Sequence, residues 1–296
     1  MSNATPAIEL VDLHYAYGRS DAVNGFNLTV QPGCCYGLFG RNGAGKTTTM
    51  KCLLNLLRPQ SGTVRLFGLN PAKQEVEVKR RLAYVPDAVA FYPWMSVRET
   101  LDYLASFRAH WNGQIEAELL QRFDLDPNQR ASALSKGQRT QVALVAAICP
   151  EPDLLLLDEP TSGLDPIVRR EFIETVIGAY QEGGPGARTI LVSTHLISEF
   201  EGLIDQFTIV DHGRAVLSLD ADEARSRYQK IHARFSGAAP EITLAGALRS
   251  RRHGRELEVI ANGGAGAIMD QLRRLSPESL TSESLTLEEV FVATLK

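Results

Sequence analysis

The residues with the clearest chemical meaning form a glycine-rich loop at residues 40–47. The run Gly-Arg-Asn-Gly-Ala-Gly-Lys-Thr fits the phosphate-binding spacing G-x-x-x-x-G-K-[ST]. Glycines let successive backbone N–H groups curl around a β-phosphate, and a helix beginning beside them points its positive dipole end at the same oxygens. Lys46 is therefore predicted to contact the β- and γ-phosphates, and the Thr47 hydroxyl to bind Mg²⁺. The predicted nucleotide-binding residues of this loop are Gly40, Arg41, Asn42, Gly43, Ala44, Gly45, Lys46, Thr47 and Thr48.

Two adjacent acids, Asp158 and Glu159, follow an apolar run at residues 154–157. A strand of this kind would deliver Asp158 to the C-terminal edge of an open α/β sheet, where ligands bind. An aspartate there can hold Mg²⁺, and Glu159 could polarise an attacking water as general base. Taken alone, the run fits equally a core strand that enters a turn. The presence of a phosphate loop in the same chain favours the chemical interpretation.

A third motif, Leu-Ser-Lys-Gly-Gln at residues 134–138, stands at the start of a predicted helix and precedes the acid pair. It resembles the signature motif of ABC ATPases, usually LSGGQ. Tyr17 resembles the aromatic residue that stacks on adenine in this family. Residues 162–165, Ser-Gly-Leu-Asp, resemble the D-loop, and His195 resembles the switch histidine. The resemblance runs from residue 8 to about residue 215.

The resemblance implies a P-loop NTPase fold of the ABC type, with a RecA-like core, an antiparallel β subdomain and a helical subdomain at about residues 90–150. It implies ATP and Mg²⁺ as cofactors and Glu159, His195 and Lys46 as catalytic residues. It also implies a head-to-tail dimer with two ATP molecules held between two cassettes, most simply two copies of this chain. The further nucleotide-binding residues implied in that dimer are Tyr17, Ser135, Gly137, Gln138 and Asp165.

Two positions depart from the family pattern. Asp87 follows a strand pattern at 82–85 and Pro86, where members usually carry the Q-loop glutamine. Its carboxylate could join Thr47 and Asp158 around Mg²⁺, but it would repel a γ-phosphate if unpaired, so catalytic rate or coupling is expected to differ. Lys136 replaces the first glycine of the signature pair. Because a helix N-terminus and the Ser135 hydroxyl remain, the added cation is expected to be tolerated or to help.

Hydrophobic patterning predicts the α/β framework that must position these motifs. A helix is expected from near Gly45 to before Pro59, and others at 97–109, 114–123, 136–148 and 166–181. Strands are expected at 8–15, 25–30, 35–39, 64–68, 154–158, 189–194 and 206–210. From residue 220 the pattern changes to short strands at 231–235 and 256–261 and a helix near 266–275. We therefore expect a nucleotide-binding domain at 1–219 and a small α+β domain at 220–296.

Composition narrows the class of protein. The 296 residues are 44% apolar and 22% charged, as in ordinary globular proteins, and the net charge of −4 gives no support to a nucleic-acid binder. The four cysteines lack metal-ligand spacing. No signal-peptide pattern and no run of about 18 apolar residues is present, so a membrane would be reached through a partner.

The family resemblance predicts an ATP-hydrolysing subunit on the cytosolic face of a membrane, where it drives a separate permease. Phe91, Tyr92, Trp94 and Met95, within residues 91–108, would meet the permease or pack inside the helical subdomain. The ending Leu-Thr-Leu-Glu-Glu-Val-Phe at 285–291 resembles the tail of ABC-2-type exporters. The C-terminal extension would regulate the dimer, contact the permease or only stabilise the chain.

The main alternative is a soluble ABC ATPase that clamps a macromolecular partner. Such proteins normally carry two cassettes, long coiled coils or zinc insertions, and this sequence has none of these patterns, which favours transport. A nucleotide sensor without hydrolysis is disfavoured because Lys46, Asp158, Glu159 and His195 occur together.

Overall fold

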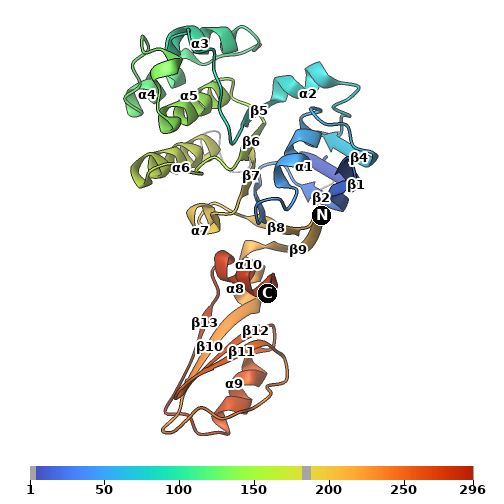
Figure 1. The fold of residues 1–296 in the computed structure, drawn as a ribbon, viewed down its shortest axis with the longest axis vertical. Coiled ribbons are helices and arrows are strands. Elements are labelled where there is room, and N and C mark those ends of the chain that lie inside the picture. The colour runs from blue at the N-terminus through green and yellow to red at the C-terminus, as the bar shows by residue number, and fades with distance from the viewer. Residues whose placement is uncertain (1–4, 182–187, 296) are drawn as a thin grey trace. The chain divides into compact units, whose positions relative to one another are not determined.

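The computed structural model describes residues 5–181 and 188–295. These residues form two compact units, Met1–Val216 and Leu217–Lys296, drawn as ribbons in Figure 1. The expected boundary lay between residues 219 and 220, and the division falls earlier, inside strand β9 (Arg214–Asp220). Within the described ranges, every helix is too short or too polar to cross a membrane.

The first unit contains two sheets. One has three antiparallel strands in the order β2-β1-β4, and the other has six strands in the order β5-β6-β7-β3-β8-β9, with parallel pairing from β5 to β8. The remaining strands are β1 (Ile8–Tyr17), β2 (Ser20–Val30), β3 (Cys35–Gly40), β4 (Ser61–Leu66), β5 (Leu82–Val85), β6 (Leu154–Asp158), β7 (Thr189–Thr194) and β8 (Gln206–Asp211). The helices are α1 (Lys46–Leu53), α2 (Glu75–Arg81), α3 (Val97–Ala105), α4 (Gly113–Arg122), η1 (Ala131–Ala133), α5 (Lys136–Ile148), α6 (Pro166–Gln181) and α7 (Ile197–Phe200).

The central strands of the larger sheet are buried along their whole length. Every residue of β3, β6 and β7 is buried, as expected for parallel strands covered on both faces. This explains why their sequences are continuous apolar runs rather than alternating patterns. Their carboxyl ends carry Gly40, Asp158 and Thr194, so the sheet brings the motifs that follow these residues to one edge.

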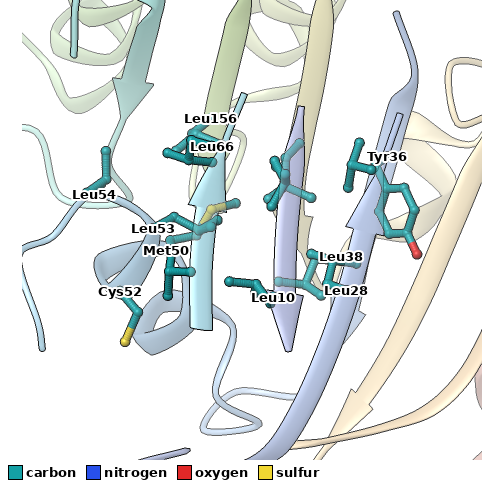
Figure 2. Close-up of a cluster of buried hydrophobic side chains, with 14 of the residues drawn as sticks. Leu10, Leu28, Tyr36, Leu38, Met50, Cys52, Leu53, Leu54, Leu66 and Leu156 are labelled. Carbon is teal, nitrogen blue, oxygen red and sulfur yellow. The ribbon is translucent and has the colours of Figure 1, made fainter. Parts of the chain in front are cut away.

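The buried apolar side chains of helix α1 belong to a hydrophobic core that includes residues of both sheets. Its buried Met50 and Leu53 pack in one cluster with Leu10 of β1, Leu66 of β4 and Leu156 of β6, as Figure 2 shows. The cluster therefore joins the small sheet, the helix and the large sheet. Because α1 starts directly after the glycine-rich loop, this packing holds one end of the loop in place.

Helix α1 ends earlier than the expected limit before Pro59. Asn55 takes a left-handed φ of 56°, while its N–H donates to the Cys52 carbonyl at 3.1 Å and the Leu56 N–H donates to the Lys51 carbonyl at 2.9 Å. This is a Schellman ending with asparagine in the left-handed position. Residues 55–58 are thus outside the helix.

Two other expected elements also end before the predicted residue, and the strand among them begins earlier than predicted, at Ser61. The strand expected at 64–68 ends at Leu66, because Phe67 and Gly68 take φ values of 55° and 78° and turn the chain back. The helix expected at 97–109 ends at Ala105, and Arg108 instead donates hydrogen bonds to the carbonyls of Lys79 and Leu82 at 3.0 and 2.9 Å. Together, α3, α4, η1 and α5 lie within the expected helical region of residues 90–150.

The second unit is a small α+β structure. Its antiparallel sheet has the order β11-β12-β10-β13, and its core joins Ile231, Val259 and Leu272 from two strands and a helix. Lys230 contacts the Glu289 carboxylate, which links β10 to α10. The elements are α8 (Ala221–Arg227), β10 (Tyr228–Arg234), β11 (Ala247–His253), β12 (Glu256–Asn262), α9 (Ala265–Arg273), β13 (Ser279–Ser284) and α10 (Leu287–Thr294).

All four cysteine thiols are buried. Cys34, Cys35, Cys52 and Cys149 are reduced thiols that are buried from solvent. Burial raises the pKa of Cys52 to about 11 and that of Cys149 to about 12, and it also raises the pKa of Cys35. Cys35, Cys52 and Cys149 therefore stay protonated at neutral pH.

Candidate active site

The glycine-rich loop connects β3 to α1 and has a backbone that only glycine fits well. Gly43 and Gly45 take φ values of 82° and 107°. A Cβ at Gly45 would lie 2.3 Å from the Ala22 carbonyl oxygen, and one at Gly40 would lie 2.7 Å from the Val210 oxygen. The loop is thus pressed against β2 and the end of β8. Because these glycines lack a Cβ, the loop can lie this close to both strands and still curl as a phosphate cradle requires.

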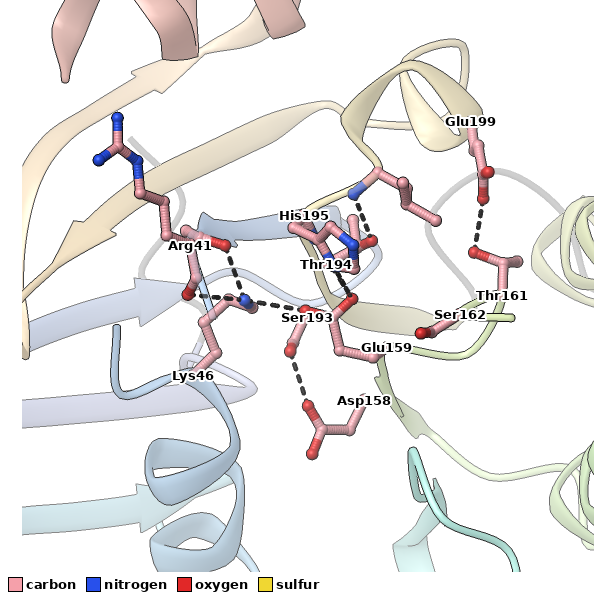
Figure 3. Close-up of polar contacts among 12 residues, drawn as sticks. Arg41, Lys46, Asp158, Glu159, Thr161, Ser162, Ser193, Thr194, His195 and Glu199 are labelled. Carbon is pink, nitrogen blue, oxygen red and sulfur yellow. Dashed lines mark hydrogen bonds and ion pairs between the residues drawn. The ribbon is translucent and has the colours of Figure 1, made fainter. Parts of the chain in front are cut away.

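Lys46 lies at the start of α1 and its side chain is 5% exposed. Its ammonium donates hydrogen bonds to the carbonyls of Gly40 at 2.7 Å and Arg41 at 3.3 Å. It also forms an ion pair with Glu159, with Nζ 2.8 Å from Oε1 (Figure 3). The lysine charge is therefore held directly over the loop.

Asp158 ends β6 and is completely buried. Its Oδ1 accepts hydrogen bonds from the hydroxyls of Ser193 at 2.7 Å and Thr47 at 3.1 Å, and its Oδ2 accepts one from Tyr84 at 3.4 Å. Burial raises the pKa of this carboxyl, while the hydrogen bonds from Ser193 and Thr47 act in the opposite direction. A carboxylate and a hydroxyl this close offer the hard oxygen ligands that suit Mg²⁺.

Glu159 follows directly and has an unusual backbone. Its φ of 46° lies in the left-handed region, and its N–H donates to the Ser193 carbonyl at 2.8 Å. Its Oε2 lies 2.7 Å from His195 Nδ1 and also accepts the His195 backbone N–H at 3.3 Å. The left-handed turn thus directs the carboxylate between Lys46 and His195, at the mouth of the loop.

Lys46, Glu159 and His195 line one cavity of about 440 Å³, whereas the buried Asp158 is not among its lining residues. The cavity brings together Tyr17, the loop residues Arg41 to Thr48, Asp87, Glu159 and His195, all expected from the sequence. Tyr17 is 51% exposed and contacts Tyr15 edge to face. The cavity also includes Ser20, Asp21 and Ala22, which sequence reasoning missed, and Ser162, which was assigned to the D-loop but not to nucleotide binding. The glycine at position 45 indicated that some backbone segment packs closely against the loop, because glycine often occurs at such positions. In the structure that segment contains Ala22.

The chemistry of the donors fits a nucleotide with its metal. Among the described residues, no group of three or more His, Cys, Asp or Glu side chains could hold a metal ion by itself. Mg²⁺ rarely needs such a group, because it keeps several waters and uses one or two protein oxygens beside substrate phosphates. Thr47 and Asp158 can supply those oxygens, and Asp87 lines the same cavity.

The signature residues Ser135, Gly137 and Gln138 are not among those that line this cavity, although Lys136 of the same motif hydrogen-bonds Ser162, which does line it. Ser135 caps α5: its Oγ accepts the Gln138 N–H at 3.1 Å, and Gln138 Oε1 accepts the Ser135 N–H at 3.0 Å. Asp165 caps α6 through the N–H groups of Ile167 and Val168, at 3.0 and 3.1 Å. Of the residues expected to bind nucleotide, Gly40, Ser135, Gly137, Gln138 and Asp165 are not among those that line the cavity.

A second, larger groove of about 740 Å³ lies beside α2, β5 and α3. Its apolar wall includes Val76, Phe91 and Phe107, and Lys79 and Arg80 add positive charge. Next to it lies an aromatic patch, defined as Tyr92, Trp94, Tyr103 and Phe107. The Tyr92 ring stacks on the Trp94 ring with their centroids 5.0 Å apart. Tyr103 packs edge to face against Tyr92 and Phe107, with centroid distances of 5.8 and 5.1 Å.

The patch is largely exposed. The exposed fractions are 64% for Trp94, 69% for Phe107 and 46% for Tyr92. The sequence left two interpretations of this aromatic segment, contact with a permease or packing inside the helical subdomain. These three exposed side chains do not pack inside the helical subdomain.

Comparisons with known proteins assign the family. The family described as ABC transporter matches residues 23–162. The chain is 33% identical to the bacitracin transport ATP-binding protein BcrA of Bacillus licheniformis, over 75% of this chain and 72% of that protein. It is 36% identical to the Nod factor export ATP-binding protein I of Paraburkholderia xenovorans (strain LB400), over 71% of this chain and 69% of that protein. A solved structure titled "Structure of ATP binding subunit of ABC transporter" superposes with a TM-score of 0.67 at 29% identity, covering 74% of this chain and 92% of that one.

Proposed function

Because the chain belongs to the ABC transporter family as an ATP-binding subunit, we propose that it hydrolyses ATP with Mg²⁺ to drive a separate membrane permease. The observation that carries the proposal is the position of Glu159 between Lys46 and His195, at 2.8 and 2.7 Å. One cavity thus combines a cation for phosphates, a carboxylate that can act as base and a histidine beside it.

Each residue has a proposed role. Lys46 and the loop N–H groups bind the β- and γ-phosphates, and Tyr17 stacks on the adenine. Thr47 and Asp158 hold Mg²⁺, with Asp87 at the same edge, and the metal when bound neutralises phosphate charge. Glu159 accepts a proton from the attacking water, and His195 orients Glu159 and contacts the γ-phosphate.

We propose that two copies of the chain bind head to tail around two ATP molecules. Ser135, Gly137 and Gln138 lie at the start of helix α5 and are not among the residues that line the cavity of their own protomer. A helix N-terminus with a serine hydroxyl is well suited to phosphate oxygens, so these residues would meet ATP held by the second copy. Asp165 belongs to the same interface in this proposal.

The permease would bind at the groove beside α2, β5 and α3. An apolar wall with cationic edges suits a short amphipathic helix that carries acidic side chains. The aromatic patch extends this surface with large, exposed rings of the kind that often anchor interfaces. In this proposal the chain lies on the cytosolic face of the membrane and serves export, as the Nod factor relative's name states for that protein.

The test compares ATP hydrolysis by the purified chain and its Glu159→Gln variant, with Mg²⁺ or with EDTA. We expect Mg²⁺-dependent hydrolysis that falls by about 100-fold or more in the variant, since loss of a general base typically costs ~10²–10⁴. We also expect the variant to elute as a dimer with ATP and as a monomer with ADP. Glu118→Gln, on the exposed side of α4, is the matched control and should hydrolyse ATP at the wild-type rate. Equal hydrolysis by wild type and Glu159→Gln would contradict the proposal.

A further inference from the structure

Lys136, the residue that replaces the first signature glycine, contacts the D-loop of its own protomer. Its ammonium donates a hydrogen bond to the Ser162 carbonyl at 2.5 Å, although 26 residues separate the two in sequence. Gly163, the next D-loop residue, has a φ of 70°, and a Cβ there would lie only 3.0 Å from Lys136 Nζ. The lysine and the glycine therefore fit each other: one supplies the donor and the other leaves room for it.

The D-loop (Ser162–Asp165) is also held from its other side. Just before it, the Thr161 hydroxyl donates to Glu199 of α7 at 2.5 Å, as Figure 3 shows. Arg169 pairs with Glu199 at 2.6 Å and donates to the Leu164 carbonyl at 3.1 Å. The α7 segment follows His195, so these contacts connect the D-loop to the catalytic side.

Without Lys136, these contacts would leave the signature end of the D-loop unsupported. The Ser162 N–H donates to the Glu159 carbonyl at 3.1 Å, and the Leu164 N–H donates to the Thr161 carbonyl at 3.2 Å. Both bonds are internal to the turn. Among the hydrogen bonds of the described residues, the Lys136 contact is the one that ties this turn to α5.

We propose that Lys136 is a positioning residue that fixes the D-loop to the signature helix within one protomer, so that both segments meet the second copy as one body. The part of this inference that concerns the second copy rests on the proposed dimer. A glycine at position 136 has no side chain and could not make the link. A charge-assisted hydrogen bond on a partly exposed loop reduces the freedom that would otherwise be lost on association.

The first experiment measures hydrogen exchange of the Ser162 and Leu164 amides in the full chain without added nucleotide. Lys136→Met keeps the length of the side chain and removes its donor, and we expect these amides to exchange about three- to tenfold faster, as loss of about 1 kcal/mol implies. Lys136→Arg should restore slow exchange. Arg170→Ala, which removes an 83% exposed cation from the adjacent helix, is the control and should change nothing. Wild-type exchange rates in Lys136→Met would overturn the proposal.

The second experiment measures the ATP-dependent dimer of the Glu159→Gln chain by light scattering, with and without Lys136→Met. We expect the dissociation constant of the dimer to rise about fivefold with Lys136→Met and to return with Lys136→Arg. A weaker dimer with unchanged D-loop exchange would mean that Lys136 acts directly on the second copy, and it would overturn the proposal. If no variant dimerises with ATP, the proposed function and the dimer part of this inference both fail, and hydrogen exchange alone decides the link within the protomer.

Discussion

At the scale of single residues, Asp158 is where hydrogen bonds from three elements converge. Hydroxyls from α1, β7 and β5 all donate to its carboxylate, and the one from Tyr84 of β5 belongs to no nucleotide-binding motif. Burial raises the pKa of Tyr84, and the nearby Asp158 carboxylate raises it further, so this phenol stays protonated and can donate. Tyr84 therefore holds the oxygen of Asp158 that faces away from Thr47.

Tyr84→Phe should weaken the binding of Mg²⁺ without changing ATP binding in EDTA. Loss of a hydrogen bond behind a metal ligand usually costs about 10–100-fold in metal affinity. Because the bond here is long, at 3.4 Å, we expect about three- to tenfold. The measurement is the Mg²⁺ concentration that gives half-maximal binding of a fluorescent ATP analogue. Tyr103→Phe, in the aromatic patch, is the control, and an unchanged Mg²⁺ requirement in Tyr84→Phe would refute this role.

At the scale of elements, helix α10 contains most of the segment 285–291 that resembles the tail of ABC-2-type exporters. Thr286 and Glu289 form a capping box at its start, and Leu287 and Val290 are buried. Lys230 and Thr286 together lower the pKa of Glu289 even though burial acts in the opposite direction. The Glu289 hydrogen bond raises the pKa of Lys230. The segment that resembles an exporter tail is thus an anchored helix end.

Glu289→Gln should destabilise the second unit by a small, pH-dependent amount. The Glu289 side chain is 37% exposed, so screening by solvent limits the expected loss to about 0.5 kcal/mol at pH 7. Because the folded pKa of Glu289 lies below its ordinary value, its contribution exists above about pH 4.3 and disappears as the pH falls through the folded pKa.

Urea denaturation of both chains from pH 7 down to pH 3 measures this difference. We expect a constant gap in the free energy of unfolding between pH 7 and about pH 5, and convergence of the two chains near pH 3. A gap that persists unchanged at pH 3 would show that the carboxylate charge is not its source.

Short sequence patterns were sufficient to predict those elements whose structure is set by residues close to them in the sequence. The glycine spacing predicted the loop before α1, and the apolar runs predicted strands at 154–158 and 189–194, where the structure has β6 and β7. The capping pattern at Thr286 and Glu289 was available too, and it would have predicted α10. The early end of α1 depended on Asn55 taking the left-handed conformation, which asparagine adopts only in some contexts.

Contacts between distant segments could not be read in the same way. Tyr84 is 74 residues from Asp158, and Lys136 is 26 residues from Ser162. These pairs meet only because β5 lies beside β6 and α5 lies close to α6, which is a property of the strand order and helix packing. Most of the cavity could therefore be predicted, whereas the residues that support it could not.

At the scale of the whole molecule, the nucleotide cavity belongs to one unit alone. All of its lining residues lie within Met1–Val216, and the core of the second unit contains no residue of the first. Two cores that do not share residues can unfold in separate steps.

Heating should therefore produce two transitions, of which ATP raises one. EDTA is present to prevent hydrolysis, and ATP is added at about 100 times its dissociation constant. Under these conditions the free energy of unfolding of the first unit should rise by about 2.7 kcal/mol. The second transition, identified by its small shift to lower temperature in Glu289→Gln, should not move when ATP is added. Calorimetry with and without ATP checks this, and a single transition that moves as a whole would contradict it.

The four buried thiols have a practical consequence for spectroscopy. Because Cys34, Cys35, Cys52 and Cys149 are buried and three of them have raised pKa values, maleimide dyes and spin labels should react slowly with the native chain. A cysteine introduced on the surface would then be the preferred site of attachment. Distances within a working transporter could be followed through such labels without first removing the natural cysteines.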